Sequence, residues 1–211
     1  WYRYHSDGIP AGAFGDWRDG AGHKWSAKEE TRMTPWELAD FKRRMEEIRR
    51  QNGEAQQKRH ADGAAKAKAL IDAADLATPE NPYLKHKGIN QPVEDLYQAS
   101  IETVFEVLGY IPQSSGEKLQ GPILIVPITL PDGTVSSCEL IDGDRRKSAI
   151  AGGRKAGGYW SAQSLDNAET ILIGEGIATV LSTREATGYP VVAALSGGNL
   201  QAIAETMRGK Y

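Results

Sequence analysis

The stretch from Thr170 to Ser182, "TILIGEGIATVLS", decides which fold the C-terminal part of the chain adopts. Four strand-forming residues lead directly into Gly174-Glu175-Gly176, and a helix-like segment begins at once. A second apolar strand, 191–195, follows after a Gly-Tyr-Pro turn and is itself followed by a glycine turn and another helical segment. Continuous apolar strands that alternate with helices are typical of a parallel βαβ unit. The stretch therefore predicts an α/β arrangement for this part of the chain.

Glu175 is a lone carboxylate between two glycines, at the carboxyl end of the first predicted strand. In open α/β sheets, ligands bind beyond the carboxyl ends of the strands. The glycines permit a tight turn and a close approach of substrate, and the positive end of the following helix favours an ionised carboxylate. Such a carboxylate can hold Mg²⁺ or accept a proton from an attacking hydroxyl. Strand-to-helix geometry alone fits a simple helix cap equally well.

A second glycine loop, Ser196-Gly197-Gly198-Asn199, follows the adjacent predicted strand. Its backbone N–H groups and the next helix N-terminus predict a cradle for phosphate. A Gly-Gly turn is a weak signal by itself, because most such turns bind nothing. We nevertheless expect Gly176, Gly197, Gly198 and Asn199 to be nucleotide-binding positions.

A glycine-rich segment between Asp144 and Asp166 contains basic residues and no acidic ones. Its basic residues are Arg145, Arg146, Lys147, Arg154 and Lys155. Phosphate binding explains this segregation better than solubility does, since the chain as a whole is acidic. The letters "GGRKAGG" lack the spacing of a Walker A loop. Tyr159 and Trp160 follow directly; they fit base stacking, but a core position in a strand is the favoured interpretation.

The region upstream is β-rich. The runs "PILIVPITL" and "TVSSCELID" flank Pro131-Asp132-Gly133, which predicts a hairpin. Cys138 lies in this hairpin and is expected to be a buried, inert thiol. The segment "TPENPYLKHKGINQP" before it is expected to be a loop, and a short helix is expected from Ser100 as N-cap to Leu108, closed by glycine.

The N-terminal half divides into a β-element over residues 1–33 and a helical stretch over 34–78. Residues 1–31 predict two or three antiparallel strands whose aromatic residues form a miniature core rather than a base-stacking platform. Thr34 and Glu37 form a capping box with proline at the first helical position. The stretch that follows is expected to be one long helix, or two helices hinged at a glycine.

Composition excludes several classes of protein. The chain has 211 residues, a net charge of −3 and one cysteine, which rules out a disulfide framework, a Cys-based zinc site and a uniformly basic surface. Neither a membrane span nor a signal peptide is visible, so a cytoplasmic protein is expected. The absence of an initiating methionine suggests a fragment of a longer chain.

The run "LIGEGIATVLS…GYPVVAALSGGNL" resembles the first half of a TOPRIM domain, the nucleotidyl-transfer and strand-cleavage module of bacterial-type primases and topoisomerases. In that family, a glutamate in a strand–Glu-Gly–helix element is an acid/base group or metal ligand, and Glu175 occupies that place. The preceding "GPILIVPITLPDGTVSSCELID…RRKSAIAGGRKAGGYWSA" resembles the basic β-rich region that binds template and nucleotides in primases. The sequence most resembles the primases of phages, integrated elements and conjugative plasmids, which include the TraC type.

The resemblance implies an α+β or α/β chain with four parts: residues 1–33, the helix or helical hairpin 34–78, a basic primase-core subdomain 79–165, and half of a Rossmann-like TOPRIM unit 166–211. It implies synthesis of RNA primers on single-stranded DNA from ribonucleoside triphosphates, with Mg²⁺ or Mn²⁺ and without zinc. Glu175 would be the metal ligand or general base. A replicative helicase stays open as a further partner, and a membrane is not expected.

The chain departs from the family pattern in its acidic residues. A TOPRIM domain needs an Asp-x-Asp pair on a later strand, which would begin just beyond residue 211; Asp142-Gly-Asp144 has the right letters but precedes Glu175, in a hairpin. The chain as it stands is therefore expected to lack half of its metal carboxylates. Two alternatives follow: a non-catalytic nucleic-acid or protein interaction module with a TOPRIM skeleton, and a TOPRIM nuclease or topoisomerase-like enzyme.

Overall fold

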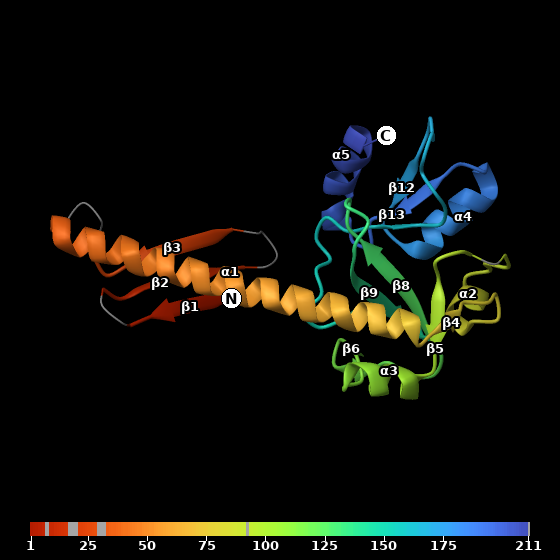
Figure 1. Ribbon diagram of the computed structural model, residues 1–211, viewed down its shortest axis with the longest axis horizontal. Coiled ribbons are helices and arrows are strands. Elements are labelled where there is room, and N and C mark those ends of the chain that lie inside the picture. The colour runs from red at the N-terminus through yellow and green to blue at the C-terminus, as the bar shows by residue number, and fades with distance from the viewer. Residues whose placement is uncertain (7–8, 17–20, 29–32, 92, 211) are drawn as a thin grey trace. The chain divides into compact units, whose positions relative to one another are not determined.

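The chain divides into two compact units, Trp1–Ala55 and Gln56–Tyr211 (Figure 1). The computed structural model describes residues 1–6, 9–16, 21–28, 33–91 and 93–210. Helices and sheets occur together in the chain, which confirms the mixed helix-and-sheet class. The TOPRIM arrangement and the boundaries at residues 33, 78 and 165 stay predictions.

The first unit contains the predicted antiparallel sheet. Its strands follow the order β1-β2-β3 and comprise β1 (Tyr2–His5), β2 (Ala11–Gly15) and β3 (Gly22–Ser26). The prediction that its aromatic residues form a miniature core is wrong for those that the structure describes. Tyr2 is 86% exposed and Trp25 is 51% exposed. Ala11 is only partly buried and lines a hollow together with Phe41 and Met45 of the following helix.

The helix α1 (Pro35–Asp72) is continuous, so the alternative of two helices hinged at a glycine is wrong. The capping box is confirmed: the Glu37 amide donates to Thr34 Oγ1 at 3.3 Å, and the Thr34 amide donates to Glu37 Oε2 at 2.8 Å. Gly63 lies inside α1 and is buried, and a Cβ on it would lie 2.6 Å from the Cα of Gly153. A glycine therefore allows α1 to approach the glycine-rich basic segment closely.

The second unit is built on an antiparallel sheet with the strand order β10-β9-β8-β5-β4. Its strands are β4 (Asp75–Leu76), β5 (Tyr97–Ala99), β8 (Ile123–Thr129), β9 (Val135–Ile141) and β10 (Lys147–Ala149). The strands β8 and β9 form the hairpin predicted around Pro131-Asp132-Gly133. A second small hairpin joins β6 (Gln113–Ser114) to β7 (Glu117–Lys118).

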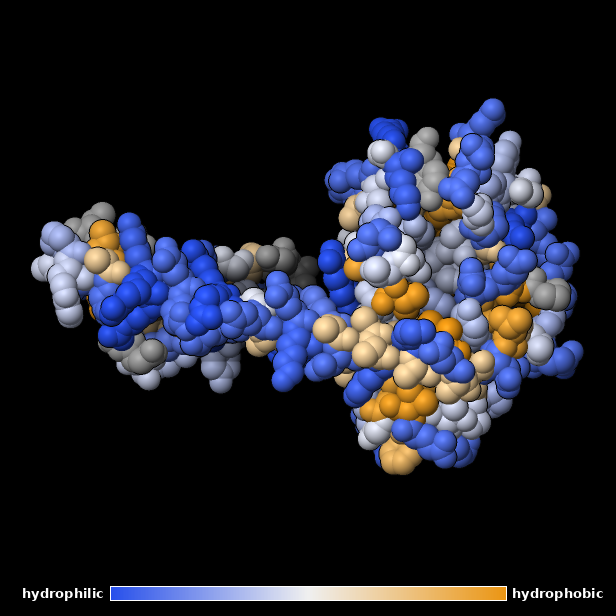
Figure 2. All heavy atoms as spheres, viewed as in Figure 1, coloured by the Kyte–Doolittle hydropathy of each residue, from blue (hydrophilic) through white to orange (hydrophobic). Residues whose placement is uncertain are grey.

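Both faces of this sheet are buried, because successive residues of β8 point to opposite sides. Ile123 and Ile125 pack in a cluster with residues of α1 and of α3 (Ile101–Leu108). Leu124 and Val126 pack in a separate cluster with residues of the C-terminal helix-and-strand region. In the view of Figure 2, apolar side chains gather over the C-terminal part of α1 and over α3, whereas the part of α1 in the first unit is mostly hydrophilic.

Two short helices bear on the predictions for this region. The helix α3 is confirmed, since the Thr103 amide donates to Ser100 Oγ at 3.2 Å and Gly109 ends the helix with a φ of 78°. The segment predicted as a loop contains α2 (Pro82–His86) instead. Pro82 begins this helix, where its missing N–H group is not needed, and Tyr83 and Leu84 are buried.

The C-terminal region contains the predicted βαβ unit. Its elements are β11 (Trp160–Ser161), β12 (Leu172–Gly174), α4 (Ile177–Thr187), β13 (Val191–Ala193), the 3₁₀ turn η2 (Gly197–Asn199) and α5 (Leu200–Lys210). The strands β12 and β13 are parallel, and β11 is antiparallel to β13. Val191 shares a buried cluster with residues of α4, and Val192 shares one with residues of α5. The two helices therefore cover opposite faces of this sheet (Figure 1).

Candidate functional site

The two predicted glycine loops lie side by side at the carboxyl ends of β12 and β13. Glu175 follows β12 directly, and its side chain is exposed. A Cβ on Gly197 would lie 3.7 Å from Glu175 Oε2, so the carboxylate rests over the second loop. The Leu195 amide donates to the Glu175 carbonyl oxygen at 2.7 Å and joins the loops through the backbone. The sheet edge therefore brings together Glu175 and the loop that contains Gly197.

The N-terminus of α4 lies at the same edge and receives a basic side chain from the large sheet. Gly176 is the N-cap, and no side-chain hydrogen bond caps α4 within the described residues. The helix-cap interpretation of Glu175 is therefore not supported. A Cβ on Gly176 would lie 3.8 Å from Lys147 Nζ. An ammonium group and uncapped helix N–H groups together favour the binding of an anion.

Lys147 and Lys155 are held by one buried carboxylate, Glu139 of β9. Lys155 Nζ donates to Glu139 Oε1 at 2.8 Å, and Lys147 Nζ lies 3.5 Å from Glu139 Oε2. Glu139 is 3% exposed. The burial of Tyr83, together with the negative charge of Glu139, raises the pKa of Tyr83 to about 12. This group, the Glu139 cluster, contains two ammonium groups and one carboxylate. Positive charge is therefore in excess there.

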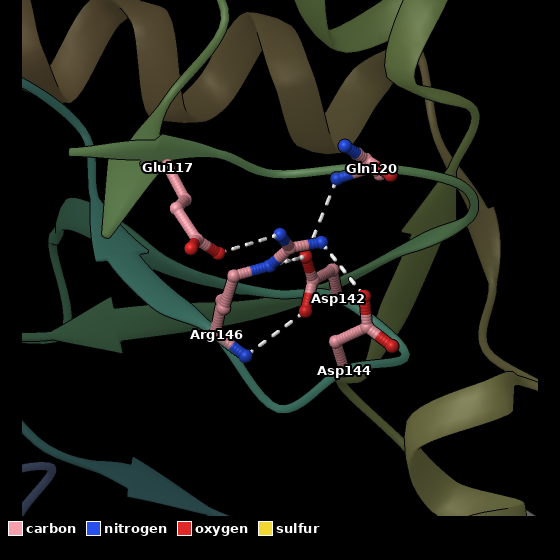
Figure 3. Close-up of polar contacts among 5 residues, drawn as sticks. All are labelled: Glu117, Gln120, Asp142, Asp144 and Arg146. Atoms are coloured by element: carbon pink, nitrogen blue, oxygen red, sulfur yellow. Dashed lines mark hydrogen bonds and ion pairs between the residues drawn. The ribbon is translucent and has the colours of Figure 1, made fainter. Parts of the chain in front are cut away.

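Arg146 has the opposite surroundings (Figure 3). Its guanidinium donates to Asp142 Oδ2 at 2.7 Å, to Asp144 Oδ2 at 2.9 Å and to Glu117 Oε2 at 3.1 Å. Asp142 is fully buried, and its hydrogen bond raises the pKa of Arg146. The backbone N–H of Gln120 also donates to Asp142 Oδ2 at 3.3 Å. In this group, called the Arg146 cluster, the guanidinium that the sequence predicted to bind phosphate is paired with three carboxylates instead.

The remaining basic side chains of the segment are at the surface. Arg145 is exposed with a φ of 69°, and no hydrogen bond or ion pair joins its side chain to the described residues. Arg154 is exposed and donates from Nε to the Ala156 carbonyl at 3.1 Å. Both guanidinium groups are accessible to a polyanion.

Asn199 is buried and has an internal role in the fold. Its Nδ2 donates to the carbonyl oxygens of Gly158 at 2.8 Å and of Ala194 at 3.0 Å, and its Oδ1 accepts from the Gly157 amide at 2.9 Å. The side chain thus ties the glycine-rich segment to the end of β13. Direct nucleotide contact by Asn199 stays a prediction, as it does for Gly176, Gly197 and Gly198.

The favoured interpretations of the aromatic pair and of the cysteine are confirmed. Tyr159 and Trp160 are buried, and Trp160 Nε1 donates to the Asp95 carbonyl at 2.9 Å. Cys138 is fully buried, and burial raises the pKa of its thiol to about 12. None of these side chains is available to stack on bases or to react.

Glu175 fits Mg²⁺ as a single ligand. Mg²⁺ is commonly bound through one or two carboxylates, with waters and substrate phosphates completing its shell. The described residues contain no group of three or more His, Cys, Asp or Glu side chains arranged to hold a metal ion. Further ligands to an ion at Glu175 would therefore come from substrate, water or residues outside this part of the chain.

Comparisons with known proteins point to one kind of relative. The chain is 28% identical to DNA primase TraC of Escherichia coli over 213 residues, which is all of this chain and 18% of that protein. A second Escherichia coli DNA primase TraC is 27% identical over 214 residues, which is all of this chain and 13% of that protein. No protein-family model matches the chain, and no solved structure matches it significantly.

These relatives are much longer than the present chain, which spans less than a fifth of the length of either relative. Among the helices that the structure describes, none is both long and apolar enough to cross a membrane. Over its whole length, this chain is similar in sequence to TraC-type DNA primases.

Proposed function

We propose that this chain is the part of a TraC-like DNA primase that binds single-stranded DNA and nucleotide phosphates. One observation carries the proposal: Glu175, Gly197 and the ammonium group of Lys147 come together at one sheet edge. Phosphoryl-transfer sites use groups of these kinds: a carboxylate, uncapped helix N–H groups and an ammonium group. The similarity to the TraC primases supports the same function independently.

In this proposal, the edge is the first half of a TOPRIM active site, and the whole protein makes RNA primers with Mg²⁺. Bound Mg²⁺ would neutralise phosphate charge. Glu175 would contribute one ligand or accept the proton of an attacking hydroxyl. Lys147 and the N-terminus of α4 would hold a phosphate, while Arg145 and Arg154 would contact the template backbone.

Binding of single-stranded DNA at several salt concentrations tests the template surface. Replacing four basic residues by glutamine, namely Arg145, Lys147, Arg154 and Lys155, should weaken binding. It should also flatten the slope of log affinity against log salt by about 0.7 for each phosphate that the variant no longer neutralises. The matched control neutralises four exposed basic residues elsewhere in the second unit: Lys58, Lys68, Lys118 and Arg208. Equal slopes for the two variants would contradict the proposal.

The role of Glu175 needs a separate measurement in the full-length protein. Glu175→Gln should leave binding of DNA unchanged, because the side chain is exposed and only its charge is removed. Primer synthesis from ribonucleotides should fall about a hundredfold or more, as expected for a general base or metal ligand. Synthesis at the wild-type rate would exclude Glu175 from the reaction. Intact DNA binding with no synthesis by the wild-type protein would favour an interaction module.

A further inference from the structure

One face of the sheet in the first unit carries its basic side chains. Directly paired residues of neighbouring strands point to the same side of a sheet. Arg3 pairs with Ala13, and Ala13 pairs with Lys24, so the two charged residues flank one small residue. Ala11 lies two residues before Ala13 and pairs with His5, so this second row belongs to the same face. This face, called here the basic face, combines positive charge with small side chains.

The basic face and α1 line a hollow of about 380 Å³ within the first unit. All five residues named above contribute to its lining. From α1, Phe41, Met45 and Ile48 line the hollow at spacings of four and three residues, which place their side chains on one stripe of the helix. Arg49 and Asn52 of α1 line it as well. The hollow therefore has an apolar interior and basic groups on both of its sides.

The positive charges at this hollow lack a counter-charge. Arg3, Lys24 and Arg49 are exposed, and no hydrogen bond or ion pair joins their side chains to the part of the chain that the structure describes. Among the described residues that line the hollow, none is Asp or Glu. An anionic ligand with apolar groups would complement this lining in both charge and polarity.

The acidic residues of an adjoining hollow are already paired. That hollow is lined by Glu37 and Asp40 of α1. Glu37 accepts hydrogen bonds from Lys28, and Asp40 forms ion pairs with Arg43 and Arg44. These carboxylates are thus neutralised by other basic residues, so the negative charge that complements the basic face has to come from a ligand.

The lining favours a peptide over a nucleic acid as that ligand. Proteins that hold single strands place aromatic side chains where bases can stack on them. Here Tyr2, Tyr4 and Phe14 lie on the opposite face, because their positions alternate with those of the basic face. Apart from Phe41 and Trp25, the apolar lining is aliphatic or thioether: Ala11, Ala13, Met45 and Ile48. Such surfaces accept the apolar side chains of a peptide, and methionine adapts to partners of different shape.

The open edges of the sheet support the same choice. In the described part of this sheet, β1 and β3 each pair only with the central strand β2. An extended peptide can pair its backbone with an open edge while alternate side chains enter a neighbouring pocket. A phosphodiester backbone has no N–H groups with which to form such a ladder.

We propose that this hollow binds an acidic peptide segment of a partner protein. Its carboxylates pair with Arg3, Lys24 and Arg49, and its apolar side chains enter between the alanines of the basic face and the apolar stripe of α1. Exposed ion pairs contribute little each, so the buried apolar groups supply most of the affinity and the charges supply the selectivity. The proposal concerns the first unit and does not depend on the function proposed for the sheet edge with Glu175.

Selection from a display library of short random peptides tests the proposal without a known partner. The full wild-type chain is the target, after removal of peptides that bind a variant with Arg3→Gln, Lys24→Gln and Arg49→Gln. Enriched peptides should combine several Asp or Glu residues with Leu, Ile, Met or Phe. Enrichment without an excess of acidic residues, or no enrichment at all, would overturn the proposal.

The most enriched peptide is then the probe for binding assays with the full chain. The triple glutamine variant should bind it about tenfold more weakly and with a smaller dependence on salt, because three ion pairs are lost. Ala13→Leu fills the hollow without removing charge and should also weaken binding. The matched control neutralises three exposed basic residues of α1 outside the hollow: Lys42, Arg43 and Arg50. A control that binds as weakly as the triple glutamine variant would contradict the proposal.

Nuclear magnetic resonance of the wild-type chain locates the peptide without any variant. The peptide should shift the signals of Ala13, Met45 and Ile48 and leave those around Glu175 in place. Shifts confined to the second unit would overturn the proposal. The same result would follow if single-stranded DNA displaced the peptide and itself shifted the signals of the hollow, because a nucleic acid would then be the occupant.

Discussion

The Arg146 cluster and the Glu139 cluster use neighbouring basic residues in opposite ways. Around Arg146, one guanidinium is surrounded by three carboxylates, of which Asp142 is fully buried. Around Glu139, one buried carboxylate holds two ammonium groups. In the first arrangement, carboxylates neutralise the positive charge and the ion pairs stabilise the fold. In the second, an excess of positive charge remains at a sheet edge. A run of basic residues is therefore not equivalent to a basic surface, since residues distant in sequence decide which charges remain.

The largest expected effect comes from removing Arg146. Arg146→Ala leaves the buried Asp142 carboxylate without its charge partner, so the free energy of unfolding should fall by about 3–5 kcal/mol. Urea unfolding measures this change. Arg145→Ala is the control, since Arg145 is an exposed neighbour, and it should stay within about 0.5 kcal/mol of wild type. Similar values for the two variants would mean that the Arg146 cluster is not structural.

Removing the carboxylate charge of Glu139 from the Glu139 cluster should lower the free energy of unfolding by less. Glu139→Gln keeps the shape of the side chain but leaves Lys147 and Lys155 without a counter-charge, at an expected cost of about 1–3 kcal/mol. The matched variant is Glu117→Gln, which removes an exposed carboxylate from the Arg146 cluster and should cost at most about 1 kcal/mol. A larger loss in the free energy of unfolding for Glu117→Gln than for Glu139→Gln would contradict this prediction.

The two lysines should not be equivalent partners of Glu139. Lys155 lies at 2.8 Å and Lys147 at 3.5 Å from the carboxylate oxygens. A double-mutant cycle should give a coupling of about 1.5 kcal/mol or more for Lys155, as for a charged hydrogen bond. The coupling for Lys147 should lie below about 1 kcal/mol. A stronger coupling for Lys147 would show that this lysine is fixed to Glu139 rather than free to meet a phosphate.

The smallest effect is expected at a partly buried ion pair in the first unit, Lys28 and Glu37. Hydrogen bonds from Lys28, and then from Thr34, lower the pKa of Glu37 from 4.5 to about 2. Because the pKa is depressed in the folded state, the resulting stability is fully present above about pH 4.5 and is lost as the pH falls through 2. An NMR titration of the Glu37 carboxyl should give a pKa of about 2, and Lys28→Met should raise it. The control Lys42→Met should leave it unchanged.

Local patterns predicted much of the fold. The capping box placed the start of α1 at Thr34, and the turn Pro131-Asp132-Gly133 placed the β8–β9 hairpin. The apolar strands 170–173 and 191–195 predicted the parallel pair β12 and β13. In each case the determining signal lies within a few residues of the element that it specifies.

Features that depend on distant residues could not be predicted in the same way. Glu139 and Asp142 lie outside the basic segment, so no local pattern showed that they engage its charges. The aromatic residues of β1–β3 suggested a core, because nothing in their own segment showed that Tyr2, Tyr4 and Trp25 stay exposed. The glycines of the helical stretch suggested a possible hinge, since nothing near Gly63 in the sequence showed that it lies against Gly153.

Asn199 has a consequence for the entropy of binding. A glycine-rich segment has more freedom to lose on binding than other sequences do. Here the carboxamide of Asn199 already fixes Gly157 and Gly158 against Ala194 of the sheet edge. The conformational entropy of that part of the loop is therefore lost when the chain folds, and a ligand that reaches Lys155 meets a preorganised backbone. A buried amide thus contributes to affinity without touching what is bound.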